Sequence, residues 1–266
     1  MLEKKPTEQP VSDVDVQRQI GQLTRRSFAV GAVAGLTGFA GWFWLRNAAP
    51  DGDLPWPLRR ALEINERLAG AYFKETRLAP AFPPDQAREP RVNGEIGLAT
   101  EAPANWKLHV DNASLALTLT LADIQALPRA EMVTELKCVE GWSEVVQWAG
   151  VRLVDFAARY KLGTRSGDAI DPSAKAADLL RYVGFTTPDE RYYVGFDAPS
   201  AFHPQTLLAY EMNGQPLTAG HGAPLRLITA VKYGYKSLKC IGTISFTDRR
   251  PPDYWAERGY DWHAGH

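Results

Sequence analysis

Hydrophobic positions divide the chain into three kinds of segment. From Phe28 to Leu45 no residue is charged, and this length is near the shortest that spans a bilayer as a helix. From Leu58 to Phe73 apolar side chains recur at roughly helical spacing within a charged stretch, which predicts an amphipathic helix. Four prolines between residues 79 and 90 then predict an extended segment.

Downstream of Trp106, apolar positions alternate with polar ones, and this predicts a β-rich region. We expect strands at 106–110, 115–119, 131–137, 179–186, 191–196, 207–212, 215–217, 224–228 and 241–247. We expect helices at 120–127, capped by Thr120, and at 151–160. Asn213-Gly214 between two strands predicts a tight hairpin. The pattern lacks regular β-α alternation, so it predicts an α+β fold of mainly mixed or antiparallel strands.

Composition narrows the function classes. Apolar residues make up 45% and charged residues 23%, with a net charge of −1; this is ordinary for a globular protein and gives no reason to expect nucleic acid as a partner. Two cysteines are too few for a disulfide scaffold or a structural zinc site. The sequence contains no Gly-rich phosphate loop, no G-x-S-x-G elbow and no His-Glu-x-x-His motif. The histidines show no ligand spacing, and we expect His263 and His266 to be solvated.

A paired arginine precedes the uncharged stretch, in the run Thr24-Arg25-Arg26-Ser27-Phe28. Because the segment that follows is only weakly apolar and rich in Gly and Ala, it resembles a twin-arginine export signal, which carries folded proteins across a membrane. An uncleaved membrane anchor is the alternative. Residues 1–23 are polar and charged, and we expect them to be disordered.

Cys138 is one of the two cysteines and ends the strand expected at 131–137. Three interpretations are open from the residues alone. Cys138 could be a buried structural thiol, half of a disulfide with Cys240, or a thiolate ligand to a soft metal.

A second group of candidate residues is basic and rich in small side chains. It comprises the run from His221 to Arg226 and the run from Tyr233 to Lys239. Small residues allow a close backbone approach, while Arg226, Lys236 and Lys239 supply positive charge, so the pattern suits an anionic cofactor. The alternative is a strand pair with exposed basic residues.

Together, Lys137-Cys138-Val139-Glu140-Gly141-Trp142-Ser143, Trp148-Ala149-Gly150 and the two basic runs resemble the sulfite oxidase-like molybdopterin oxidoreductases, and within them the periplasmic protein-methionine-sulfoxide reductase catalytic subunits. The resemblance covers about residues 90–250. It implies a molybdenum–molybdopterin cofactor with Cys138 as the metal ligand and catalytic residue. The cofactor-binding residues that it implies are Asn93, Glu95, Thr187, His221, Arg226, Ser237, Leu238 and Lys239.

The same resemblance implies oxygen-atom transfer at molybdenum. True sulfite oxidases carry an arginine-rich run after the cysteine, whereas Val139 to Ser143 stands here, and Glu140 would repel sulfite. A sulfoxide such as methionine sulfoxide is therefore the expected substrate. The alternatives are an oxidase of a sulfur oxyanion and a non-catalytic periplasmic binding or scaffold protein. The expected pocket walls are Trp142, Tyr193 and Tyr235, and we expect Cys240 to be an unpaired buried thiol.

The expected organisation follows from these segments. Residues 1–46 form the twin-arginine signal or anchor, residues 47–90 a linker with a helix and a Pro-rich segment, and residues 91–266 the molybdopterin-binding domain. The sequence has no haem or iron–sulfur ligand set, so we expect a membrane haem or quinol-linked protein to supply electrons in the periplasm.

Overall fold

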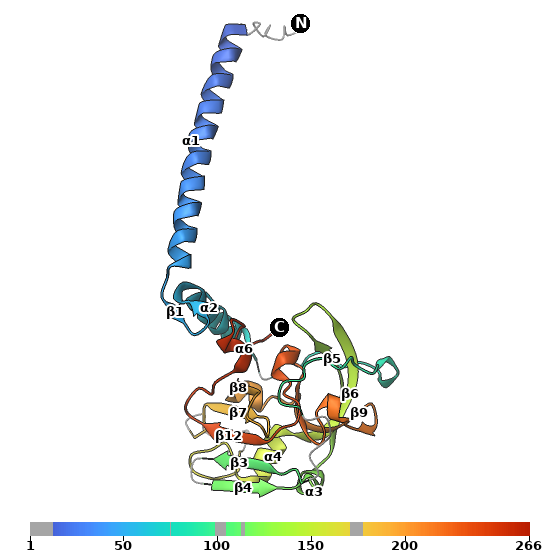
Figure 1. The fold of residues 1–266 in the computed structure, drawn as a ribbon. Coiled ribbons are helices and arrows are strands. Elements are labelled where there is room, and N and C mark those ends of the chain that lie inside the picture. Colours follow the sequence, from blue (N-terminus) through green and yellow to red (C-terminus); the bar gives the residue numbers. More distant parts are fainter. Residues whose placement is uncertain (1–12, 75, 99–104, 113–114, 171–177) are drawn as a thin grey trace, which may run out of the picture. The chain divides into compact units, whose positions relative to one another are not determined.

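The computed structural model describes residues 13–74, 76–98, 105–112, 115–170 and 178–266 (Figure 1). Two compact units divide the chain. One runs up to Asp51 and adds Pro55–Pro57, and the other comprises Gly52–Leu54 and Leu58–His266.

The first unit consists mainly of helix α1 (Asp13–Arg46). Its segment Thr24–Arg46 has a mean hydropathy of 1.5 and is long and apolar enough to cross a membrane. The helix already begins at Asp13, so the expectation of disorder is wrong for residues 13–23, while residues 1–12 lie outside the described part. Short strands β1 (Pro50–Asp51) and β2 (Leu54–Pro55) follow α1.

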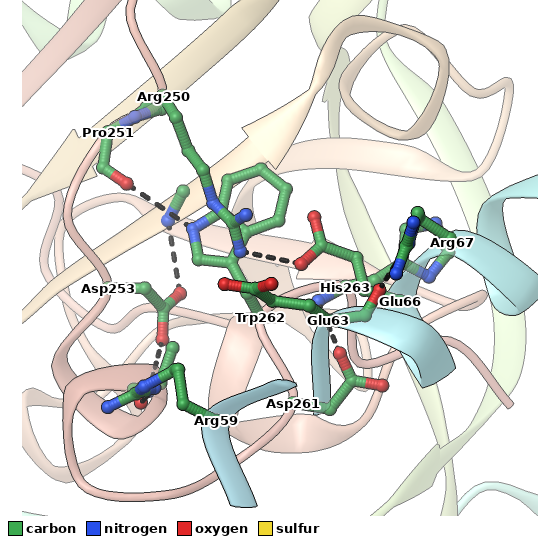
Figure 2. A network of polar contacts seen from close by, with 12 residues as sticks. Arg59, Glu63, Glu66, Arg67, Arg250, Pro251, Asp253, Asp261, Trp262 and His263 are labelled. Carbon is green, nitrogen blue, oxygen red and sulfur yellow. Dashed lines mark hydrogen bonds and ion pairs between the residues drawn. The ribbon is translucent and has the colours of Figure 1, made fainter. Parts of the chain in front are cut away.

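Helix α2 (Trp56–Tyr72) confirms the amphipathic helix expected near this position. None of its residues is fully buried, and polar contacts connect it to the C-terminal segment (Figure 2). Glu66 lies 2.7 Å from Arg250, and Arg59 donates to the Ala256 carbonyl. In the proline-rich segment that follows, residues 84–86 form a short 3-10 turn, η1 (Pro84–Gln86).

Two five-stranded sheets form the body of the second unit (Figure 1). One has the order β4 (Leu115–Leu119), β3 (Leu108–Asn112), β12 (Thr243–Thr247), β7 (Tyr182–Thr186), β8 (Tyr193–Asp197). The other has the order β10 (Gln215–Pro216), β9 (Thr206–Met212), β6 (Ser143–Arg152), β5 (Ala130–Lys137), with β11 (Arg226–Thr229) also paired to β9. Strands β3 and β12 run parallel, and the other neighbouring pairs of these two sheets are antiparallel. The α+β architecture is as expected.

Short helical segments lie between these strands and after the last one. They are α3 (Leu121–Gln125), α4 (Leu153–Tyr160), α5 (Ala198–Ala201), η2 (Ala219–His221), η3 (Gly234–Lys236) and α6 (Tyr254–Glu257). The Thr120 hydroxyl accepts from the Asp123 backbone N–H and the Asp123 carboxylate accepts from the Thr120 N–H, so a capping box starts α3 as the sequence predicts. Asn213 and Gly214 both have positive φ in the β9–β10 turn, as the tight hairpin requires.

Strand β9 is buried on both faces. Leu208 and Tyr210 face the large core shared by the two sheets. Leu207 and Ala209 face a smaller apolar cluster with Trp148 of β6. Because side chains alternate along a strand, Arg226 of β11 lies on the same face as Ile228, which belongs to the smaller cluster.

A buried ion pair attaches η3 to the C-terminal segment. The Lys236 ammonium lies 2.5 Å from an Asp253 carboxylate oxygen, with side chains 1% and 0% exposed, and it also donates to the Gly195 carbonyl. We expect Lys236→Met to lower the free energy of unfolding by about 3–5 kcal/mol, because Asp253 then keeps a buried charge without its cation. Denaturant unfolding measures this loss. The double variant Lys236→Met/Asp253→Asn should recover part of it, and equal losses in the two variants would contradict the explanation.

Candidate functional site

The turn between β5 and β6 positions Cys138. The last strand pair joins Lys137 to Ser143. Beyond it, the Cys138 N–H donates to the Trp142 carbonyl over 2.9 Å, and the Gly141 N–H donates back to the Cys138 carbonyl over 3.2 Å. The thiol is therefore held on a short, hydrogen-bonded turn at the end of a long antiparallel pair. Cys138 is partly buried and free, as the metal-ligand interpretation requires.

Cys138 lies in the wall of a cavity of about 200 Å³. Segments far apart in the sequence form this cavity: the loop before residue 97, the β5–β6 turn, the two basic runs and the C-terminal segment. The lining residues are Pro90, Arg91, Asn93, Gly94, Ile96, Leu136, Cys138, Val139, Glu140, Trp142, Tyr192, His221, Arg226, Gly234, Tyr235, Ser237, Lys239, Trp255 and Tyr260.

Buried polar groups without partners line one side of the cavity. Arg226 is 4% exposed and donates to the carbonyls of His221 and Ser237, while its Nε has no hydrogen-bond partner among the described residues. The Ser237 hydroxyl is likewise buried without a partner there. Because unpaired buried polar groups are costly, these atoms indicate a site that is completed by a polar ligand.

The charge on this side is positive. Lys239 donates to the Gly94 and Gly220 carbonyls, and burial, together with the charge of Arg226, lowers its pKa to about 8. Burial also lowers the pKa of His221, and the charges of Arg226 and Lys239 act in the same direction. A bound anion would relieve the repulsion between these groups.

Two glycines allow the basic runs to approach the site. Gly222 has a φ of +93°, and a Cβ there would lie 2.7 Å from the Lys239 Cβ. A Cβ at Gly234 would lie 3.2 Å from the Lys137 carbonyl oxygen. The first glycine brings η2 against Lys239, and the second brings η3 against the strand end that carries Cys138.

A polar cluster surrounds the thiol. Asn93 Nδ2 lies 3.9 Å from Cys138 Sγ and 3.2 Å from Glu140 Oε2. Trp142 Nε1 donates to the same carboxylate oxygen over 3.0 Å, and the guanidinium of Arg91 lies 5.0 Å from the centre of the Trp142 ring. Burial raises the pKa of the Cys138 thiol, and the charge of Glu140 also raises it. An added cation beside Sγ would therefore favour the thiolate.

The structure brings most of the predicted site residues together. Six line the cavity: Asn93, Cys138, His221, Arg226, Ser237 and Lys239.

The other three predicted residues lie outside the lining. Glu95 is exposed, and its charge acts on Lys239. Thr187 is buried and donates to Asp189. Leu238 belongs to the large core. Their roles as cofactor ligands stay predictions.

Two positions differ from the expected lining. Tyr192 lines the cavity and donates to the Tyr235 carbonyl, whereas Tyr193 points away and donates to Glu257, because neighbouring residues of an extended chain face opposite sides. Lys236 does not supply charge to the cavity, since its ammonium is held by Asp253. Trp142 and Tyr235 line the cavity as expected.

The C-terminal segment also contributes to the site, which the sequence pattern does not predict. Trp255 and Tyr260 line the cavity, and their rings pack 4.9 Å apart. The density of aromatic residues after Pro252 is the signal that could have indicated a segment folded onto the core.

The second cysteine does not pair with the first. Cys240 is 3% exposed and free, as expected, and burial raises its thiol pKa to about 11. No group of three or more His, Cys, Asp or Glu side chains that could hold a metal occurs among the described residues. A metal at Cys138 would therefore need further ligands from a cofactor.

Comparisons with known proteins agree with this geometry. Residues 95–255 match the family model "Oxidoreductase molybdopterin binding domain". The protein-methionine-sulfoxide reductase catalytic subunit MsrP of Ralstonia nicotianae is 34% identical, over 92% of this chain and 75% of that protein. MsrP of Burkholderia mallei is 31% identical, over 92% of this chain and 75% of that protein.

Among solved structures, the sulfane dehydrogenase SoxCD from Paracoccus pantotrophus matches with a TM-score of 0.46 and 17% identity, over 67% of this chain and 50% of that one. The family match covers more than half of the chain, and the MsrP relatives extend over most of it. The chain therefore belongs to the oxidoreductase molybdopterin-binding domain family and is a molybdopterin-dependent oxidoreductase.

Proposed function

We propose that this protein reduces a sulfoxide, with methionine sulfoxide as the representative substrate, at a molybdenum–molybdopterin cofactor held in the cavity. One observation carries the site assignment: a free thiol, Cys138, shares a cavity with Arg226 and Ser237, whose buried Nε and hydroxyl have no partner among the residues that the structure describes. The names of the MsrP relatives support the substrate class.

The residues present fit such a cofactor. Cys138 offers a soft thiolate, which suits molybdenum bound to sulfur ligands. Arg226, Ser237 and Lys239 offer donors for an anionic group, and donors of the first two lack partners in the described part of the chain. His221 and Asn93 complete the proposed set along the cavity wall, with Glu95, Thr187 and Leu238 adjoining it.

When bound, the cofactor supplies two-electron oxygen-atom transfer, and the chain supplies positioning and protons. Removing an oxygen atom from a sulfoxide as water consumes two protons. Glu140 is exposed and also lines the cavity, so its Oε atoms can receive protons from solvent and deliver them beside Cys138. Asn93 and Trp142 hold this carboxylate in place. Trp142, Tyr192 and Tyr235 form walls that limit the entry of water.

The negative charge of Glu140 affects which substrate can enter the cavity. Glu140 lines the cavity close to Cys138 and would repel a sulfite dianion. Arg91 also lines the cavity, but it stacks on Trp142. Glu140 does not repel a neutral sulfoxide. The site therefore favours a sulfoxide as the substrate, and with it the reductive reaction.

The proposed location is the periplasm, reached by the twin-arginine route with Arg25 and Arg26 as the signal pair. Helix α1 supports either a signal or a retained anchor, because Thr24–Arg46 is long and apolar enough to cross a membrane. A membrane haem or quinol-linked protein would supply the electrons, and an anchored enzyme would stay close to it.

Two assays on the cofactor-loaded protein test the proposal. Methionine sulfoxide should be reduced with reduced benzyl viologen as electron donor, and sulfite should not be oxidised with ferricyanide as acceptor. Sulfite oxidation without sulfoxide reduction would establish the alternative oxidase. A correctly exported protein that contains neither molybdenum nor pterin would leave a binding or scaffold role.

The pH dependence of anion binding tests the role of Lys239 separately. The cofactor-free protein carries this ammonium below pH 8 and loses it above, because its pKa is lowered to about 8. Sulfate stays a dianion across this range, so its affinity should fall about tenfold between pH 7 and 9. Isothermal titration calorimetry measures the affinity. The Lys239→Arg variant keeps its charge and should show a flat profile, whereas the same fall in both proteins would contradict the assignment.

A further inference from the structure

A second cavity, of about 460 Å³, shares no lining residue with the first. The end of α2, residues 73–74 and 77–80 and the C-terminal segment form its walls, together with Lys137 and residues 230–231. Lys137 directly precedes Cys138, so one strand end contributes to both cavities. The proposed oxidoreductase chemistry makes no use of this second cavity.

The charged side chains that line this second cavity are all basic. Lys74, Arg77 and Lys137 line it with His263 and His266, and the lining contains no Asp or Glu within the described residues. Lys74 and Arg77 are exposed, so their charged groups are accessible to a ligand from solvent. Lys137 is 3.8 Å from Glu135, a carboxylate outside the lining. The excess of cations favours an anionic ligand.

The wall contains a buried histidine whose ring has no hydrogen-bond partner among the described residues. The sequence pattern predicts a solvated His263, and this is wrong: His263 is 4% exposed, because the C-terminal segment folds onto the core. Neither ring nitrogen has a hydrogen-bond partner among the described residues. Burial lowers its pKa to about 4, so the imidazole is neutral at pH 7 and offers one N–H donor.

A buried cation lies close to this histidine. Lys232 is 2% exposed, and its ammonium has no hydrogen-bond partner in the described structure. Its nearest carboxylate, Asp197, is 3.8 Å away, and the charge of Lys232 acts on His263. Buried polar groups that lack hydrogen bonds are costly unless something else satisfies them.

The remaining wall is apolar and partly open. Phe73, Leu78, Pro80 and Val231 contribute to it, and the Phe73 ring lies 6.0 Å from the His263 ring. Leu78 is 59% exposed at its rim. A small inorganic ion would leave this surface in water, so the walls suit an anion with an apolar body.

We propose that the second cavity is a binding site for a small organic carboxylate. Its carboxylate would lie between the cations at the rim and the N–H of His263, while its apolar part would pack on Phe73 and Leu78. Lys137 would connect occupancy of this site to the strand end that carries Cys138.

Isothermal titration calorimetry of the cofactor-loaded, full-length protein with benzoate tests this site. Benzoate should bind saturably, with a dissociation constant below about 10 mM. Benzyl alcohol, which has the same ring without the charge, should bind much more weakly. The double variant Lys74→Gln/Arg77→Gln alters two exposed side chains and should fold normally. It should weaken benzoate binding at least about fivefold, because two exposed ion pairs are lost.

Two single variants serve as matched controls. Lys107→Gln removes an exposed cation that directly precedes β3, and Arg91→Gln removes one from the cofactor cavity. Neither variant should change the affinity for benzoate. Absence of saturable binding, equal binding of benzyl alcohol, or an unchanged affinity in the double variant would overturn the proposal. Weaker binding in Arg91→Gln would place benzoate in the cofactor cavity and would overturn it as well.

Discussion

Replacing Cys138 with alanine is expected to lower oxygen-atom-transfer activity by more than about 100-fold. Loss of a group that merely orients a metal ligand already costs 10–100-fold, and Cys138 is the cysteine that lines the cofactor cavity. The experiment compares activity per bound pterin in wild-type and variant protein. Molybdenum content, determined on the same samples, shows whether the metal remains without its thiolate.

The second cysteine provides the matched control. Cys240 is buried away from the lining, so Cys240→Ala should retain activity per bound cofactor even if it lowers stability. Full activity of Cys138→Ala with a loaded cofactor would rule out the thiolate as an essential ligand.

The variant Arg226→Met is expected to lose most of its cofactor, with bound molybdenum and pterin falling at least about tenfold. The guanidinium donates to the carbonyls of His221 and Ser237, and its Nε has no hydrogen-bond partner within the described part of the chain. A buried, preorganised guanidinium binds an anion strongly. Metal analysis and pterin fluorescence of purified protein measure the loss.

The stability of the cofactor-free Arg226→Met variant should change much less than its cofactor content. Burial lowers the pKa of Arg226, which means that the unliganded protein carries a desolvated charge at a cost, and replacing such a charge by an apolar side chain is often close to neutral. The Tm of cofactor-free Arg226→Met should therefore lie within about 4 °C of the wild type. Arg250→Met is the control, because Arg250 stacks on Trp262 as Arg226 stacks on Trp148, but is exposed. Unchanged cofactor content in Arg226→Met would contradict the assigned role.

Local signals predicted much of the fold. The capping box at Thr120 and the Asn213-Gly214 turn depend on neighbouring residues, and both form as expected. Strand β6 was missed, because Val146, Trp148, Ala149 and Val151 leave no clean alternation of buried and exposed positions. Its two faces contact two different cores, and a single sequence does not reveal which partners cover each face.

The sequence also predicted several of the residues that line the candidate site. Runs such as Ser237 to Lys239 were recognised from their resemblance to a family, and most of the named side chains meet in one cavity. The sequence could not show that Lys236 pairs with Asp253 rather than a ligand, because that partner lies in a different segment. The burial of His263 likewise depends on how the C-terminal segment packs, which local periodicity does not encode.

The wall formed by Trp255 and Tyr260 has a consequence for biosynthesis. A ribosome makes these residues after every other lining residue of the cofactor cavity, so a nascent chain has an incomplete site long after Cys138 has emerged. The cavity can therefore enclose its cofactor only after Tyr260 has been synthesised and has packed against Trp255. Cofactor loading of this protein is thus expected to follow the folding of the segment after Pro252 onto the core.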